Sequence, residues 1–288
     1  MSSCSGLFHG VSYSDEPIQP RLMVGEHIFT PLDKSFTLEF DLSTRYCLGW
    51  HDLENSTSHP CPGRAVIDPK YDTCPVCQKR TGFNPAFYNV ASVSPQQEKL
   101  NQEPHILYLA HFGGDIVKVG ISRAKRGINR LLEQGARSAL VLDTFPTALI
   151  ARSYEAKIAA LPGLRETFSI RTKLSFLEHS YDHIASEKLL LETKRSLETT
   201  LNTKFSGNEV RSFDDVFFSH TFAAEPFTPL PIPKIISGTC VAVAGSILIM
   251  RYDDYQLALP LKPLTGYKLA VSKKVVPLDL PPRQASLF

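Results

Sequence analysis

Four of the six cysteines fall within one short stretch of the chain, at Cys47, Cys61, Cys74 and Cys77. Cys74 and Cys77 flank Pro75-Val76, and this spacing presents two thiolates from one tight turn to a tetrahedral ion. Four thiolates complete a closed coordination shell, which predicts a structural zinc ion rather than a catalytic one. His51 and His59 remain alternatives to one of the cysteines.

The segment around these cysteines, residues 46–103, is rich in Pro, Gly and Asp and has little helical periodicity. A loop-rich stretch of this length needs something besides a core to hold it together, and a bound metal would do so. The N-terminus has no basic stretch followed by an apolar one, so we expect a cytoplasmic chain, where clustered cysteines bind metal. No apolar run reaches about 18 residues, which predicts no membrane partner.

A second set of residues has the chemistry of phosphodiester hydrolysis. This reaction needs an activated nucleophile, a cation on the phosphate and charge relief for the leaving oxygen. Lys118 next to Tyr108 would lower the pKa of the phenol, which makes the tyrosine a better base. Arg130 would bind the phosphate with two N–H groups, and Glu155 would hold magnesium or manganese.

Two predicted strands, residues 105–111 and 116–121, must place the tyrosine and the lysine on one face. A three-residue loop, Phe112 to Gly114, would put Tyr108 directly opposite Lys118, and this is the register we expect. A two-residue Gly113-Gly114 turn would instead put Tyr108 opposite Val119 and turn the lysine away.

Helical periodicity positions the other two residues. Apolar residues from Ile128 to Ala136 form one stripe, which predicts a helix that carries Arg130 and ends near Gly135. A second helix follows Pro146, and Glu155 lies at the border of its apolar face. A third helix is expected from about Ile184 to Thr203, and a further strand over residues 139–142.

These motifs resemble the GIY-YIG nucleases. Tyr108 matches the tyrosine of the first strand motif and Val119-Gly120 the end of the second, whereas Lys118 stands where that motif has tyrosine. The resemblance implies that Arg130 is the family arginine and Glu155 the metal-binding glutamate. Over nearly the whole chain, the order of the cysteines, Leu-Tyr-Leu-Ala, Val-Lys-Val-Gly-Ile-Ser and a late Thr-Gly-Tyr is similar to family number 2797 among the domains of unknown function. That family's placement near GIY-YIG folds implies a fold rather than an activity.

Basic residues gather on the loop and helix after the second strand of this region. The formal net charge is only +2, so any basic surface must be local. Such a surface suits phosphate contacts and predicts a nucleic-acid partner. Besides Arg130, it comprises Arg123, Lys125, Arg126 and Arg137.

The chain ends in Gln284-Ala285-Ser286-Leu287-Phe288, after a proline-rich leader. This pentapeptide resembles the motif by which many bacterial repair and replication proteins bind the DNA sliding clamp. Leu287 and Phe288 would enter an apolar pocket while Gln284 forms hydrogen bonds at its rim. The resemblance implies a clamp as partner and favours DNA over RNA.

We therefore expect an α+β protein: a GIY-YIG-like α/β module flanked by a loop-rich zinc segment and small antiparallel β units. The expected parts are an N-terminal β unit (1–45), the zinc segment (46–103), the module (104–205), a linker (206–234), a C-terminal β unit (235–276) and a flexible tail (277–288). The favoured function is a metal-dependent endonuclease, or nuclease relative, in DNA metabolism. The alternatives are a non-catalytic nucleic-acid-binding protein and a tRNA-modifying enzyme.

Overall fold

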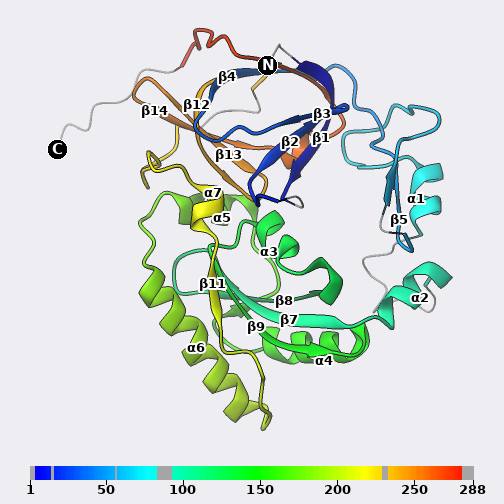
Figure 1. Cartoon of the computed structure of the whole chain (residues 1–288), viewed down its shortest axis with the longest axis vertical. Coiled ribbons are helices and arrows are strands. Elements are labelled where there is room, and N and C mark those ends of the chain that lie inside the picture. The colour runs from blue at the N-terminus through cyan, green and yellow to red at the C-terminus, as the bar shows by residue number, and fades with distance from the viewer. Residues whose placement is uncertain (1–3, 14–15, 56, 83–92, 229–232, 281–288) are drawn as a thin grey trace.

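The computed structural model describes residues 4–13, 16–55, 57–82, 93–228 and 233–280 (Figure 1). Its strands form an eight-stranded sheet, a five-stranded sheet and a two-stranded ribbon, with helices packed mainly around the five-stranded sheet. The chain is an α+β protein, as the sequence predicts. Within the described ranges, no helix is both long and apolar enough to cross a membrane.

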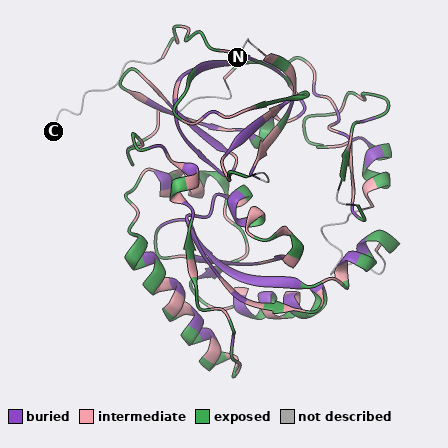
Figure 2. Cartoon of the chain, in the orientation of Figure 1, coloured by how far each residue is buried: buried purple, intermediate pink, exposed green. Residues whose placement is uncertain are grey.

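The five-stranded sheet has the order β10-β8-β7-β9-β11 and lies at the centre of the predicted module. Its central strands are buried along their length because side chains pack on both faces (Figure 2). Leu107, Leu109 and Val119 face α4 and α6, whereas Tyr108 and Ala110 face the eight-stranded sheet. The strands are β7 (His105–His111), β8 (Val117–Arg123), β9 (Ser138–Phe145), β10 (Leu164–Arg165) and β11 (Val210–Ser212).

Helices and short 3-10 turns join these strands. Gly135 ends α3 in the left-handed conformation, where the sequence predicts the stop. The helices are α2 (Pro95–Asn101), α3 (Asn129–Gln134), α4 (Ala148–Ala159), α5 (Ile170–Leu177), α6 (His183–Thr200) and α7 (Asp214–Phe217), with the 3-10 turn η2 (Ala124–Arg126).

The N-terminal and C-terminal β segments, expected as separate units, form one antiparallel sheet with the order β14-β13-β12-β4-β15-β1-β2-β3. Strand β4 lies between two C-terminal strands, so neither segment can form this core alone. The strands are β1 (Cys4–Ser12), β2 (Arg21–Val24), β3 (His27–Phe29), β4 (Ser35–Asp41), β12 (Ile235–Ala244), β13 (Ile247–Tyr252), β14 (Tyr255–Pro260) and β15 (Lys268–Ser272), with the 3-10 turn η3 (Lys262–Leu264).

Residues 206–228, expected to begin a linker, instead pack against both sheets. Strand β11 pairs with β9, and Phe213 and Phe217 are buried between the two sheets. Aromatic side chains that find an apolar surface nearby are buried there, which a proline count does not reveal. Residues 229–232 lie outside the described residues.

The two sheets are joined where their backbones almost touch. A Cβ at Gly245, in the β12–β13 turn, would lie 2.7 Å from the amide nitrogen of Gly135. The hydroxyl of Tyr13 donates to the carbonyls of Val243 (3.0 Å) and Gly245 (2.9 Å), although one proton can satisfy only one acceptor at a time. This junction fixes the end of α3 against the eight-stranded sheet.

Replacing Gly245 by alanine is expected to lower the free energy of unfolding by about 3 kcal/mol, because a positive φ and a backbone clash act together. Gly163 is the matched control, since it also has a positive φ (78°) but no atom within 4 Å of a Cβ. Gly163→Ala should lower the free energy of unfolding by only about 1 kcal/mol. Urea unfolding of both variants measures the difference. Equal losses for the two variants would contradict the close contact.

Candidate functional site

The four predicted cysteine ligands converge. The sulfurs of Cys47, Cys61, Cys74 and Cys77 all lie within 4.8 Å of one another, and Cys61 Sγ is 3.9 Å from Cys74 Sγ. Sulfurs at the corners of a tetrahedron with bonds of about 2.3 Å would be about 3.8 Å apart. The cluster could therefore hold a metal ion in a closed four-sulfur shell.

Backbone N–H groups donate to two of these sulfurs. Cys47 Sγ accepts N–H bonds from Gly49 (3.4 Å) and Cys74 (3.2 Å). Cys61 Sγ accepts from Ala65 at 3.5 Å. Gly49 is required here because it has φ 103° and a Cβ would lie 1.9 Å from the carbonyl oxygen of His59. Such N–H donors stabilise thiolates.

The metal segment consists of β5 (Trp50–Asp52), β6 (Thr57–His59) and α1 (Pro75–Thr81) around the cysteines. His51 and His59 bond to Ser58 and Thr57, and neither belongs to the ligand cluster. The buried Arg45 joins the segment to the eight-stranded sheet, donating to Thr265 O (2.8 Å) and to Asp72 Oδ1 (2.9 Å).

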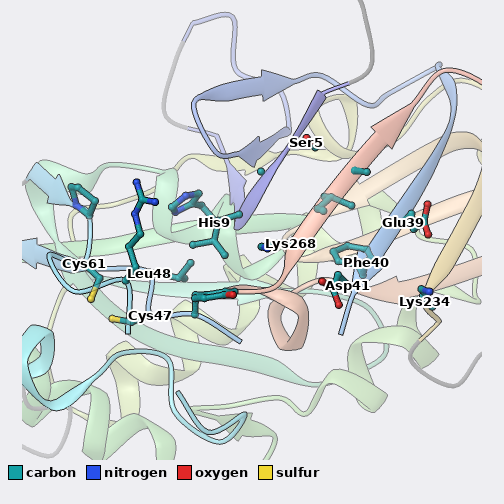
Figure 3. Close-up of a pocket in the computed structure, with 17 residues that line it drawn as sticks. Ser5, His9, Glu39, Phe40, Asp41, Cys47, Leu48, Cys61, Lys234 and Lys268 are labelled. Atoms are coloured by element: carbon teal, nitrogen blue, oxygen red, sulfur yellow. The ribbon is translucent and has the colours of Figure 1, made fainter. Parts of the chain in front are cut away.

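A cavity of about 790 Å³ separates the metal segment from the outer face of β1, β4 and β15. Cys47 and Cys61 lie at one end of it, and Glu39 and Lys234 at the other (Figure 3). Its charged lining has both signs, so it offers no uniformly basic surface for phosphate.

Tyr108 is buried on the face of β7 that looks toward the eight-stranded sheet. It pairs with Gly120, not with Lys118, because the loop between β7 and β8 has five residues, 112–116. The expected register is therefore wrong. The glycine makes the observed register possible, since a Cβ at Gly120 would lie 2.4 Å from Tyr108 Oη.

The expected face is nevertheless correct, because the register shift is two residues. Lys118 pairs with Ala110, two residues along β7 from Tyr108 and on the same face, and its Nζ lies 5.9 Å from the centre of the Tyr108 ring. The Lys118 ammonium donates to the carbonyl oxygens of Val119 and Glu166. Burial lowers the pKa of Lys118 to about 8, although Glu155 opposes this shift.

The pKa of Tyr108 is raised, which corrects the expectation that Lys118 would lower it. Burial is the largest cause, and it outweighs the hydrogen bond from Gln134 Nε2 (2.8 Å) and the charge of Arg130. At neutral pH the phenol is therefore protonated. Its oxygen accepts from Gln134 Nε2, which leaves the proton of the hydroxyl available to an acceptor.

Glu155 is buried and paired with Arg152 of the same helix, and Arg152 also lies 3.3 Å from Glu166. Burial raises the pKa of Glu155, whereas Arg152 and Lys118 lower it. The arginine thus stands between two carboxylates. Arg130 is 45% exposed and contacts Glu133 at 3.8 Å.

The four predicted residues therefore lie in one electrostatic cluster. The charges of Arg130 and Glu155 shift the pKa of Tyr108, and the same two charges shift the pKa of Lys118. Tyr108 and Lys118 come from the neighbouring strands β7 and β8, Arg130 from α3 and Glu155 from α4.

Sequence reasoning missed four members of this cluster: Gln134, Arg152, Glu166 and Lys173. Gln134 and Arg152 each lie within four positions of a predicted residue on the same helix, so helical spacing could have found them. Glu166 and Lys173 follow the second helix in a region without a recognised motif.

The predicted basic surface is smaller than expected. Arg137 is buried, forms an ion pair with Asp214 and stacks 4.0 Å from the centre of the Tyr181 ring, so it belongs to the core. Arg126 pairs with Glu133, and Arg123 lies 3.7 Å from Glu103. Lys125 and Arg130 remain exposed. The predicted clamp-binding residues Gln284, Leu287 and Phe288 lie outside the described residues.

Lys173 should make stability depend on pH. Burial lowers its pKa to about 8, with Lys118, Arg130 and Lys262 lowering it further. Between about pH 8 and about pH 10.5 the unfolded chain binds more protons than the native one, so this group makes stability rise with pH. In urea unfolding at about pH 7.5 and about pH 9.5, the wild type should gain stability relative to Lys173→Met. Parallel pH profiles would contradict the depressed pKa.

Comparison with known proteins found one family. Its sequence model, described as "Protein of unknown function (DUF2797)", matches residues 90–269. This range holds the Tyr108 cluster and runs into β15 of the eight-stranded sheet, whereas the four clustered cysteines precede it. No curated protein and no solved structure matched. Since the match covers more than half of the chain, the protein belongs to the DUF2797 family.

Proposed function

We propose that this protein acts on nucleic acid, with DNA favoured, as a metal-dependent endonuclease related to the GIY-YIG nucleases. The observation that carries the proposal is that Lys118 Nζ lies 5.9 Å from the centre of the Tyr108 ring, and that the charges of Arg130 and Glu155 act on both groups. These are the residue types that phosphodiester hydrolysis requires.

Each residue has a role that its surroundings support. Arg130 is exposed enough to bind a phosphate with two N–H groups. Lys118, fixed by two carbonyls, adds positive charge beneath the phosphate. Tyr108 is protonated, so its hydroxyl would donate to a phosphate oxygen while Gln134 holds its lone pair. Because Tyr108 is only 1% exposed, the Gln134 side chain must move for substrate to reach it.

A divalent cation would be held by Glu155, with Glu166 beside it, once Arg152 leaves the two carboxylates. Magnesium commonly binds proteins through one or two carboxylates and completes its shell with water and phosphate oxygens, so the donor set fits. When bound, the ion would neutralise charge on the scissile phosphate.

A non-catalytic nucleic-acid-binding protein is the second candidate. The Arg152–Glu155 ion pair and the buried Tyr108 favour it, because the arginine engages the carboxylate and the buried phenol stays protonated. A binder would need Arg130 and Lys118 but not Glu155.

A nicking assay on labelled branched and linear DNA, with magnesium or manganese, separates the two candidates. The wild type should cleave, and Glu155→Gln and Arg130→Gln should each reduce the rate about 100-fold or more. Glu192→Gln is the control, since that carboxylate is exposed on α6. Wild-type binding without cleavage on any substrate would support the binder and sink the hydrolytic proposal.

We further propose that the metal of the four-cysteine cluster is zinc with a structural role, since a closed four-thiolate shell suits zinc. Purified protein should contain one zinc per chain by elemental analysis, and Cys74→Ser should lose it, whereas Cys4→Ser, outside the cluster, should keep it. Trp50, the only tryptophan, packs against the cluster, so chelation should change its fluorescence. Equal zinc content in both variants would contradict this site.

A further inference from the structure

Lys173 has a half-buried ammonium beside the candidate site, although no sequence motif predicts it. It lies on α5, whose first turn is capped by Ser169 accepting from the Thr172 amide at 3.0 Å. Its Nζ donates to the carbonyl of Gln134 at 2.5 Å and lies 4.9 Å from the centre of the Phe112 ring. The side chain of the same Gln134 donates a hydrogen bond to Tyr108, so Gln134 contacts both Lys173 and the phenol.

Lys262 approaches the same place from the eight-stranded sheet. Its neighbour Leu261 donates its amide to Ser246 at 2.7 Å, and Ser246 follows Gly245. Gly245 is in backbone contact with Gly135, which follows Gln134. The junction between the sheets thus places the exposed Lys262 near the end of α3.

The charged groups that perturb Lys173 are all cations: Lys118, Arg130 and Lys262. Four positive side chains from β8, α3, α5 and η3 repel one another unless an anion lies among them. The nearby carboxylates are already engaged, since Glu133 contacts Arg126 and Arg130, while Glu155 and Glu166 contact Arg152. Positive charge therefore remains in excess at the junction.

We infer that Lys173 and Lys262 form a second phosphate subsite next to Lys118 and Arg130, so that a nucleic-acid backbone crosses from the five-stranded sheet to the eight-stranded sheet. The inference rests on the proposed function in taking the anion as a phosphodiester chain. A row of lysines and an arginine suits a polyanion, because each cation neutralises one phosphate and releases its counterions. Through Lys262, the C-terminal β segment would contribute to the proposed nucleic-acid site.

The first arm of the test uses inorganic pyrophosphate with the full-length protein, by calorimetry. Wild type should bind it, and Lys262→Gln should weaken binding about three- to five-fold, the range for an exposed charge pair. The double variant Lys173→Gln/Lys262→Gln should lose about ten-fold or more. Lys188→Gln, an exposed lysine on α6, should bind like wild type. Since Lys262 is exposed, its single variant is informative even if Lys173→Gln fails to fold. No binding by the wild type, or wild-type affinity in Lys262→Gln, would overturn the inference.

The second arm uses a labelled single-stranded oligonucleotide at several salt concentrations. Each lost phosphate contact should reduce the slope of log affinity against log salt by about 0.7. Lys262→Gln should show this reduction and Lys188→Gln should not. Binding that depends on Lys262 without any cleavage would support the phosphate subsite and contradict the nuclease proposal. Cleavage and binding that depend on Arg130 but not on Lys262 or Lys173 would support the nuclease proposal and contradict the subsite.

Discussion

The close backbone contact between Gly135 and Gly245 determines how the rest of the molecule is arranged. Only glycines allow this approach, and both have positive φ angles. Around it, Tyr13, Phe217 and Ile249 fill one apolar core that belongs to both sheets. Because the contact fixes the end of α3, it also fixes Arg130 and Gln134. The candidate site is therefore a property of the joined sheets and not of the α/β module alone.

A second glycine sets the chemistry within that frame. Gly120 leaves room for the Tyr108 ring to lie across β8, which selects the register of β7 and β8. The ring is buried as a result, and burial keeps the phenol protonated. The tyrosine is thus better suited to donate a hydrogen bond to a phosphate than to remove a proton from water. This differs from the activated base that the sequence pattern alone suggests.

The sequence predicts those features that depend on local spacing. The four cysteines, the strand pair around residues 105–123 and the stop at Gly135 all follow from short-range chemistry, and the structure confirms them. Prediction from the sequence fails where contacts between distant segments determine the structure. The β7–β8 register depends on a ring opposite a glycine, and the pairing of β4 with β12 joins residues about 200 positions apart. Arg137 looks like a surface cation until Asp214 and Tyr181 are seen to enclose it. Lys173 has no signal at all, because only the fold shows what surrounds it.

A crystal structure with a bound short oligonucleotide, carrying a non-cleavable linkage, would test the central claim most directly. One phosphate should lie within hydrogen-bond distance of Arg130 and the next near Lys173 and Lys262, with the Gly135–Gly245 contact unchanged. Phosphates bound instead in the cavity beside Cys47 and Cys61, or on α6, would contradict the proposed location of the nucleic-acid site.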